Sequence, residues 1–477
     1  MKNCPYCNRK IKESWIYCQF CNKPLLKNVD IEVKQINSQS DRFEYETLYE
    51  SEDDTAFQIN HIQDDFDDKI SELERKINEV TQYGDPIGNL LLQKASLYYK
   101  NRKFSKTQKE LENALENFKI EENELKIAIS HNELGLIKEE LGYFEDSIYH
   151  FDESIQILKN LDENKKLVQV YNNIGNAYFQ IKDIENAYKY YQNAIELSEK
   201  ENLVYEEIKS SSNIVEILFI LNDYERIKKI LNRLKEFFNN NNDIYGVITT
   251  LLKYGKLYFF LGDHYFDKSY DKLLDALELI NNIENQISVY MRSKLEWEIF
   301  LFQGKINLFW NKLSEAENLL LKSLESVRMF EIENENVNES VILKTLADLF
   351  ENKKEYEKAI EYYRLASEIY YKFGEDSKNA ELKTKIGFIY SKYIKNSLNA
   401  IDFYEQALKI FENLEYIKES ADIYNILGDI YINKGLIDLA MSSFERAKEY
   451  YKELNDIYNS ELVDEKINSL IDLNLRE

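Results

Sequence analysis

Residues 170–197 read VYNNIGNAYFQIKDIENAYKYYQNAIEL, and residues 423–450 read IYNILGDIYINKGLIDLAMSSFERAKEY. In both stretches a glycine stands three residues before a tyrosine, as at Gly175 and Tyr178. Further along, two alanines flank a large aromatic residue in the same register in both stretches. One pattern that returns near the far end of a 477-residue chain predicts a repeat architecture.

The glycine position of this pattern recurs along most of the chain. Successive steps are 40 residues over the first five positions and then 49, 43, 40 and 41 residues. The positions are Ala95, Gly135, Gly175, Val215, Gly255, Gly304, Ala347, Gly387 and Gly428. A second column of small residues stands at Ser147, Ala187, Ala316, Ala359, Ala400 and Ala440. A column of large residues follows at Phe151, Tyr191, Leu320, Tyr363, Tyr404 and Phe444, and a third small column at Ser154, Ala194, Ser323, Ala366, Ala407 and Ala447.

These columns predict paired helices. Two antiparallel helices approach closely only where a small residue faces a bulky one, and each pair must stack on the next to bury its other face. The last of the three prolines is Pro86, so no obligate helix breaker follows it. Seven residues after the small position, residues suited to a left-handed conformation end the first helix, at Gly142, Asn222, Gly262, Asn311 and Gly435. We therefore predict an all-α fold, an α-solenoid of about nine helical hairpins over residues 86–470.

The combined pattern resembles the tetratricopeptide repeat. The residues that match the family pattern are Leu427, Gly428 and Tyr431, followed by Ala440, Phe444 and Ala447. Residues 174–194 match it equally well. The period of 40 exceeds the 34 of the common repeat, so we expect helices longer than usual by up to about six residues per repeat. Periods near 40 are similar to those of kinesin light chains, Pins-type polarity adaptors and bacterial peptide-sensing Rap regulators. The resemblance implies that the chain binds peptides or proteins.

The resemblance also implies a binding surface. In tetratricopeptide proteins the first helix of each hairpin lines the concave groove, so we expect the matching positions here to bind a peptide. Amides, lysines and aromatic residues at these positions suit a partner segment that bears carboxylates. The amides and lysines are Asn132, Asn172, Asn176, Lys209, Asn213, Lys253, Lys256, Lys305, Lys344 and Lys385, and the aromatic residues are Phe259, Phe309 and Phe388.

All four cysteines stand within the first 21 residues, at Cys4, Cys7, Cys18 and Cys21. Two C-x2-C pairs separated by ten residues supply four thiolates for one tetrahedral Zn²⁺. The segment resembles the short zinc ribbons at the front of many prokaryotic proteins. We therefore predict a zinc ribbon over residues 1–25 with a structural Zn²⁺. The ribbon docks a partner, serves a redox or nucleic-acid role, or does no more than fold its own segment.

Residues 26–85 are rich in acidic residues and have no clear period, so we expect a mostly flexible linker. Within it, residues 65–80 place apolar side chains at spacings of three and four, which predicts one amphipathic helix. Residues 43–57, FEYETLYESEDDTAF, are acidic and aromatic, and their charge complements the predicted groove. They are either an autoinhibitory segment or a spacer. The 49-residue step and its aromatic segment suggest a junction between two sub-arrays at 262–300.

The net charge and the motifs that the sequence lacks argue against nucleic-acid binding, membrane binding and catalysis. A net charge of −25 disfavours nucleic acid and anionic lipid surfaces. No signal-peptide region or uninterrupted apolar span is present, so we expect a cytoplasmic protein. The four histidines, His61, His131, His150 and His264, fall in no metal or nucleophile motif, and no phosphate-binding loop occurs. We therefore predict a scaffold or adaptor without catalysis. The alternative is a peptide-sensing or transcription-related regulator whose zinc ribbon contacts nucleic acid or another protein.

Overall fold

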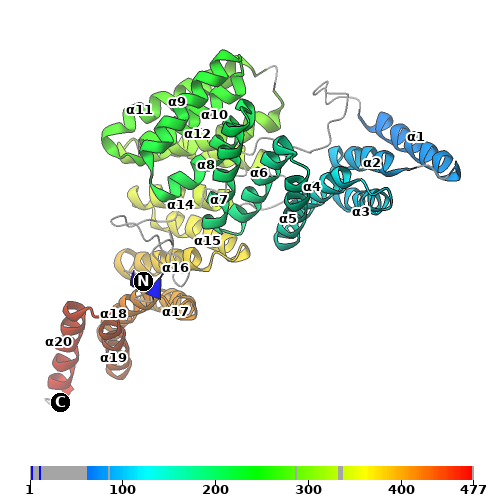
Figure 1. The fold of residues 1–477 in the computed structure, drawn as a ribbon. Coiled ribbons are helices and arrows are strands. Elements are labelled where there is room, and N and C mark those ends of the chain that lie inside the picture. The colour runs from blue at the N-terminus through cyan, green and yellow to red at the C-terminus, as the bar shows by residue number, and fades with distance from the viewer. Residues whose placement is uncertain are drawn as a thin grey trace. The chain divides into compact units, whose positions relative to one another are not determined.

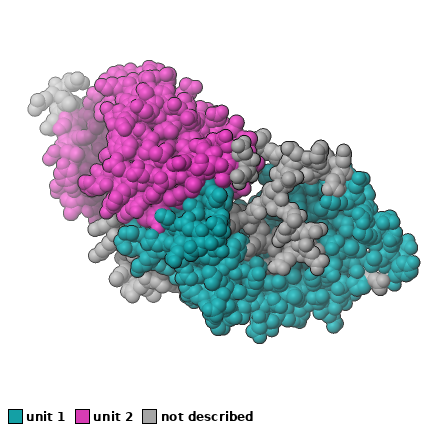
Figure 2. Space-filling model, turned by 90° about the horizontal axis from the view of Figure 1, so that it is seen from above, with its two compact units in different colours: residues 1–250 teal, residues 251–477 magenta. Residues whose placement is uncertain are grey.

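The computed structural model describes residues 2–3, 10–11, 62–83, 86–284, 287–330 and 337–474. Apart from two short strands, the described elements are helices that follow one another as antiparallel hairpins (Figure 1). Nine hairpins, from α2/α3 to α18/α19, confirm the predicted α-solenoid. The chain divides into two compact units, residues 1–250 and 251–477 (Figure 2).

Unit 1 begins with a small antiparallel pairing in which Lys2 lies opposite Ile11 and Asn3 opposite Lys10. Helix α1 precedes the hairpins, and helix α10 crosses the boundary between the units. The elements are β1 (Lys2–Asn3), β2 (Lys10–Ile11), α1 (Ile62–Tyr83), α2 (Gly88–Lys100), α3 (Phe104–Ile120), α4 (Glu124–Glu140), α5 (Phe144–Asn160), α6 (Asn164–Gln180), α7 (Ile184–Lys200), α8 (Val204–Leu221), α9 (Tyr224–Asn240) and α10 (Ile244–Phe260).

Unit 2 continues the array and ends on the single helix α20, which packs on α19. A short 3-10 turn, η2, precedes α11, and a π-helical turn, η3, ends α16. The elements are η2 (Asp263–Tyr265), α11 (Phe266–Asn282), α12 (Val289–Phe309), α13 (Leu313–Phe330), α14 (Val337–Asn352), α15 (Tyr356–Lys372), α16 (Asp376–Ile389), η3 (Tyr390–Ile394), α17 (Ser397–Asn413), α18 (Ile417–Asn433), α19 (Ile437–Glu453) and α20 (Ile457–Asn474).

The 40-residue period follows from the lengths of the helices and turns. Helices α4 to α7 have 17 residues each, and three residues separate each helix from the next. The middle residue of each such turn has a positive φ, which lets the chain reverse at once. All five turn residues predicted to adopt this conformation do so, with φ of 81° at Gly142, 56° at Asn222, 105° at Gly262, 59° at Asn311 and 72° at Gly435.

In most hairpins a large side chain of the second helix fills the space left by a glycine of the first helix. A Cβ atom built on Gly135 would lie 2.6 Å from the ring of Phe151, and one on Gly175 would lie 2.7 Å from the ring of Tyr191. The one serine of the second small column adds a hydrogen bond at the first of these glycines: Ser147 Oγ donates to the carbonyl oxygen of Gly135 at 2.8 Å. The predicted columns are therefore the contact line between the two helices of a hairpin.

Helix α1 covers the segment 65–80 for which a helix is expected. Its buried residues Phe66 and Ile70 pack against Tyr98 of α2, so this part of the acidic segment adds a layer to the first hairpin. The expected junction at 262–300 holds η2, α11 and the start of α12, all within unit 2. Among the described residues, no helix is both long enough and apolar enough to cross a membrane.

The glycine contact leads to a stability prediction. Gly175→Leu should lower the free energy of unfolding by typically 1–3 kcal/mol, because the new side chain would occupy the position of the Tyr191 ring. Glu196→Leu, on the exposed face of α7, serves as the matched control. Thermal unfolding followed by circular dichroism measures both. Equal stability of Gly175→Leu and the wild type would contradict the assigned register.

Candidate functional site

The first helices of three consecutive hairpins, α4, α6 and α8, lie next to one another and are linked by side-chain amides. Asn173 Nδ2 donates to Asn132 Oδ1 at 3.0 Å, and Asn172 Nδ2 donates to Ser210 Oγ at 2.9 Å. We call Asn132, Asn172, Asn173 and Ser210 the amide ladder. Two of its members, Asn132 and Asn172, belong to the groove predicted from the repeat resemblance.

The amide ladder is polar and largely buried, so each of its polar atoms is expected to have a hydrogen-bond partner. Asn132 Nδ2 donates to Glu133 Oε1 at 3.2 Å, and Ser210 Oγ donates to the carbonyl oxygen of Glu206 at 2.8 Å. Asn172 is 8% exposed, and its Oδ1 has no hydrogen-bond donor among the described residues. This oxygen is itself buried, so a bound chain can donate an N–H group to it only after the side chains that cover it move.

Two of the other predicted residues of unit 1, Asn176 and Lys209, have partners within the unit. Asn176 Oδ1 accepts a hydrogen bond of 2.5 Å from the hydroxyl of Tyr191, so it holds its own hairpin together. The ammonium of Lys209 lies 4.9 Å from the ring centre of Tyr205, and Lys209 is buried. Asn213 is half-buried on α8.

The predicted lysines of unit 2 stand close to groups of the chain itself. Lys253 and Lys256 are buried, and Lys256 Nζ lies 3.0 Å from Glu298 Oε1, which is also buried. Lys305 Nζ lies 5.4 Å from the ring centre of Phe302. The two remaining predicted lysines are Lys344, which is half-buried, and Lys385, whose Nζ lies 3.9 Å from Glu351 and 4.0 Å from Asp348.

The predicted aromatic residues of unit 2 belong to ring clusters. Phe259 stacks on Phe266 with ring centres 5.2 Å apart and meets Phe302 edge to face at 5.0 Å. Phe309 packs on Phe266 at 4.8 Å but remains 59% exposed. Phe388, whose ring centre lies 5.8 Å from that of Tyr393, is 36% exposed.

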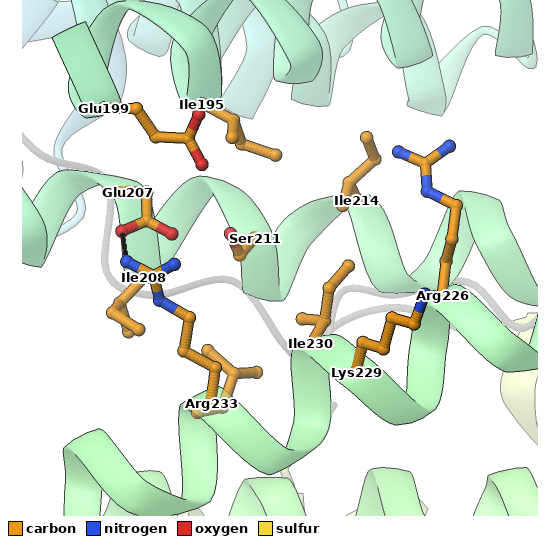
Figure 3. A pocket seen from close by; sticks show the side chains of 11 residues that line it. Ile195, Glu199, Glu207, Ile208, Ser211, Ile214, Arg226, Lys229, Ile230 and Arg233 are labelled. Atoms are coloured by element: carbon orange, nitrogen blue, oxygen red, sulfur yellow. Dashed lines mark hydrogen bonds and ion pairs between the residues drawn. The ribbon is translucent and has the colours of Figure 1, made fainter.

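A pocket of about 290 Å³ lies between α7, α8 and α9 in unit 1 (Figure 3). Its apolar lining is aliphatic and comes from all three helices: Ile195, Ile208, Ile214, Ile230 and Leu234. Ser211 is the small polar residue in the lining, and charged side chains from α7, α8 and α9 complete it. Sequence reasoning from the repeat resemblance did not find this pocket, because it considered the first helices of the hairpins alone.

The pocket has a cause in the repeat pattern. In the α8/α9 hairpin, all three small columns hold branched residues, with Val215, Ile227 and Leu234 where other repeats have glycine, alanine or serine. All three side chains are buried, so α9 is held away from α8 along the line where the other hairpins close. Replacement of all three small residues in one repeat is the sequence signal that could have predicted the pocket.

Charges of opposite sign occupy different ends of this pocket. At one end Glu207 of α8 pairs with Arg233 of α9, and Glu199 of α7 lies nearby (Figure 3). Burial raises the pKa of Glu207, while the charge of Arg233 opposes this shift. At the other end stand Arg226 and Lys229, and Arg226 Nη1 donates to the hydroxyl of Tyr188 at 2.5 Å.

Helices α4 and α5 bring two histidines together that no sequence motif connects. His131 Nδ1 and His150 Nδ1 lie 3.0 Å apart, so one ring donates to the other. Burial, together with the neighbouring His150 and Lys119, lowers the pKa of His131 to about 4, and burial also lowers the pKa of His150. Both imidazoles are therefore neutral in the folded protein at neutral pH.

The histidine pair predicts a pH dependence of stability. The unfolded chain takes up a proton on His131 near pH 6.5, whereas the folded protein resists it down to about 4, so stability is lost as the pH falls through this window. Between pH 7 and pH 5, the free energy of unfolding of the wild type should fall by about 2 kcal/mol more than that of His131→Asn. Urea unfolding at the two pH values measures both. His264→Asn, whose parent side chain is 94% exposed, is the control. The same pH dependence in His131→Asn and the wild type would contradict the assignment.

The predicted zinc ligands Cys4, Cys7, Cys18 and Cys21 lie outside the described residues, as does the segment 43–57. The first cysteine pair stands between β1 and β2 in the sequence. The antiparallel pairing of these strands brings the chain before Cys4 next to the chain after Cys7.

Comparison with known proteins gives two family matches. The tetratricopeptide repeat family matches residues 168–201, which include α7 and the part of α6 that carries Asn172. The family described as soluble NSF attachment protein, SNAP, matches residues 314–471. Both matches fall on the helical hairpins, one in each unit.

Similar proteins include a regulator and two repeat structures. The transcriptional activator NprA of Geobacillus stearothermophilus is 27% identical over 157 residues, which cover 33% of this chain and 37% of that protein. The apo quorum sensor NprR of B. thuringiensis is 13% identical, over 86% of this chain and 99% of that chain, with a TM-score of 0.46. A signal transduction ATPase with a tetratricopeptide repeat sensor from Pyrococcus horikoshii is 15% identical, over 84% of this chain and 55% of that chain, with a TM-score of 0.41.

The family matches and the fold agree on the type of protein. The tetratricopeptide repeat match covers parts of α6 and α7, whose register recurs in the other hairpins. The columns of small residues are the contact lines within those hairpins. The chain is therefore a protein of the tetratricopeptide-repeat type, built as an all-α solenoid.

Proposed function

We propose that this protein is a non-catalytic binding protein that takes a peptide segment of a partner on the first helices of its repeats. The observation that carries the proposal is the unpaired Oδ1 of Asn172 in the amide ladder. A buried acceptor without a donor is rare in folded proteins, and a ligand N–H group that displaced the side chains covering it would satisfy it. The fold supports the proposal, because repeat arrays of this kind offer extended binding surfaces.

The ladder suits a peptide backbone better than a single small polar group. Its members come from α4, α6 and α8, which stand in consecutive repeats, so a bound segment can run across three hairpins. Side-chain amides carry both a donor and an acceptor, as the peptide bond does. The main-chain groups of an extended segment can therefore replace or extend the ladder hydrogen bonds.

We also propose that the partner segment carries carboxylates. Lys344 of α14 and Lys385 of α16 support this idea, since they stand in later repeats at the positions equivalent to Asn172 and Asn173. Lys385 already lies near Asp348 and Glu351 of the chain, so an incoming carboxylate would compete with weak contacts of 3.9–4.0 Å.

The second candidate function is that of a transcription-related regulator. The similarity to a transcriptional activator over 157 residues favours it. In this version the repeat array senses a peptide and the N-terminal segment contacts nucleic acid or a protein of the transcription machinery. Binding to nucleic acid that weakens steeply with rising salt would distinguish this function from that of a scaffold.

A single zinc ion held by Cys4, Cys7, Cys18 and Cys21 forms part of the proposal. The spacing of the thiolates and the strand pairing around the first cysteine pair support it. Protein purified under reducing, chelator-free conditions should contain one zinc per chain by metal analysis, and Cys18→Ser should lower that content. Zinc-free wild-type protein would refute the metal site.

Peptide binding through the ladder can be tested with a peptide selected from a random display library on the full chain. Asn172→Ala should weaken binding of that peptide about tenfold, since it removes the free acceptor. Fluorescence anisotropy measures the affinity, and thermal unfolding checks that the variant is folded. Asn193→Ala on α7 is the control. Equal affinities of Asn172→Ala and the wild type for every selected peptide would refute the assigned surface.

A further inference from the structure

We propose that the pocket between α7, α8 and α9 binds a short peptide with free ends and aliphatic side chains. This site is separate from the amide ladder, because its lining includes the second helices α7 and α9. The proposal rests on three features of the pocket: an aliphatic floor, opposite charges at the two ends, and a length that suits about three residues.

The floor selects aliphatic side chains. Ile208, Ile214 and Leu234 are buried at its base, and Ile195 and Ile230 are half-buried above them. Among the described residues, no aromatic side chain lines the pocket, so stacking on a base or a ring is not available to a ligand from these residues. Burial of leucine-like side chains against this floor would supply the apolar part of the binding free energy.

Each end of the pocket offers one charge that the described part of the protein does not neutralise. Glu207 is paired with Arg233, whereas Glu199 beside them has no ion-pair partner among the described residues. Lys229 at the other end likewise has no ion-pair partner within the described parts of the chain. Glu199 suits a free amino terminus, and Lys229 together with Arg226 suits a free carboxylate. A zwitterionic peptide matches both ends at once.

The length of the pocket follows from the helix that lines it. Arg226 and Arg233 mark its two ends on α9 and are seven residues apart, which is about 10 Å along a helix. Three extended residues also span about 10 Å. The volume of about 290 Å³ is just below the range of small-molecule sites, so the pocket buries only part of a tripeptide and leaves the rest exposed.

The α8/α9 hairpin explains why the site occurs here in the array. The buried side chains of Val215, Ile227 and Leu234 keep the two helices apart. All three are apolar, so their burial leaves no polar group without a partner. A hairpin closed by glycine and alanine has no such gap between its helices. The residues in the packing columns of this repeat therefore account for the position of the site.

Tri-leucine is the probe, and isothermal titration calorimetry on the full chain measures its binding. We expect saturable binding to the wild type, weakened roughly three- to tenfold by Lys229→Gln and by Glu199→Gln. Lys228→Gln is the matched control, because Lys228 is exposed on α9 but does not line the pocket. All of the replaced side chains are exposed, so the variants should fold as the wild type does.

Blocked peptides assign the two ends. Acetylated tri-leucine should bind more weakly than tri-leucine, and Glu199→Gln should weaken it no further, since the amino charge is already gone. C-terminally amidated tri-leucine should lose its sensitivity to Lys229→Gln in the same way. No saturable binding of tri-leucine to the wild type would overturn the proposal. So would equal binding of free and doubly blocked peptides, or equal effects of Lys228→Gln and Lys229→Gln.

Binding of tri-leucine to the pocket can be tested independently of the proposed partner-binding function. Asn172→Ala should leave tri-leucine binding unchanged, because Asn172 does not line the pocket. Loss of partner-peptide binding in Asn172→Ala with tri-leucine binding intact would support two separate sites. If tri-leucine failed to bind while the ladder results held, the pocket alone would be discarded.

Discussion

The contact between a glycine of the first helix and a large side chain of the second is the interaction on which the array depends. At Gly135 and Gly175 the absence of a side chain lets the rings of Phe151 and Tyr191 lie directly against the helix backbone. The helices of a hairpin are thus held close over their length, and their outer faces remain apolar enough to bury the neighbouring hairpin.

The α8/α9 hairpin lacks that contact and has a different interior. Branched residues replace the small ones, so the core between the helices is filled by side chains instead of by close backbone approach. The hairpin remains apolar inside, with Ile227 and Leu231 fully buried, but a pocket opens beside it. A repeat protein can therefore create a site by changing a few residues in its packing columns without a change in fold.

Buried polar groups on the first helices represent a second constraint. Burial of an amide or a charge costs free energy unless it is hydrogen-bonded or paired. The chain meets this cost at the amide ladder by bonding asparagine to asparagine and to serine, and in unit 2 by pairing Lys256 with Glu298. Polar residues at such buried positions would lower stability if they had no partner.

The secondary structure and its period follow from the order of residues along the chain. The small columns require close helices, and the turn residues require a positive φ at fixed intervals, so nine hairpins follow from local rules. Which polar side chains contact one another depends instead on how the helices pack in three dimensions. Asn173 reaches Asn132 in the previous repeat, Asn176 turns to Tyr191 in its own hairpin, and Lys256 is buried against Glu298. These choices depend on side-chain rotamers and on the distance between neighbouring helices, and the spacing of residues along the chain specifies neither.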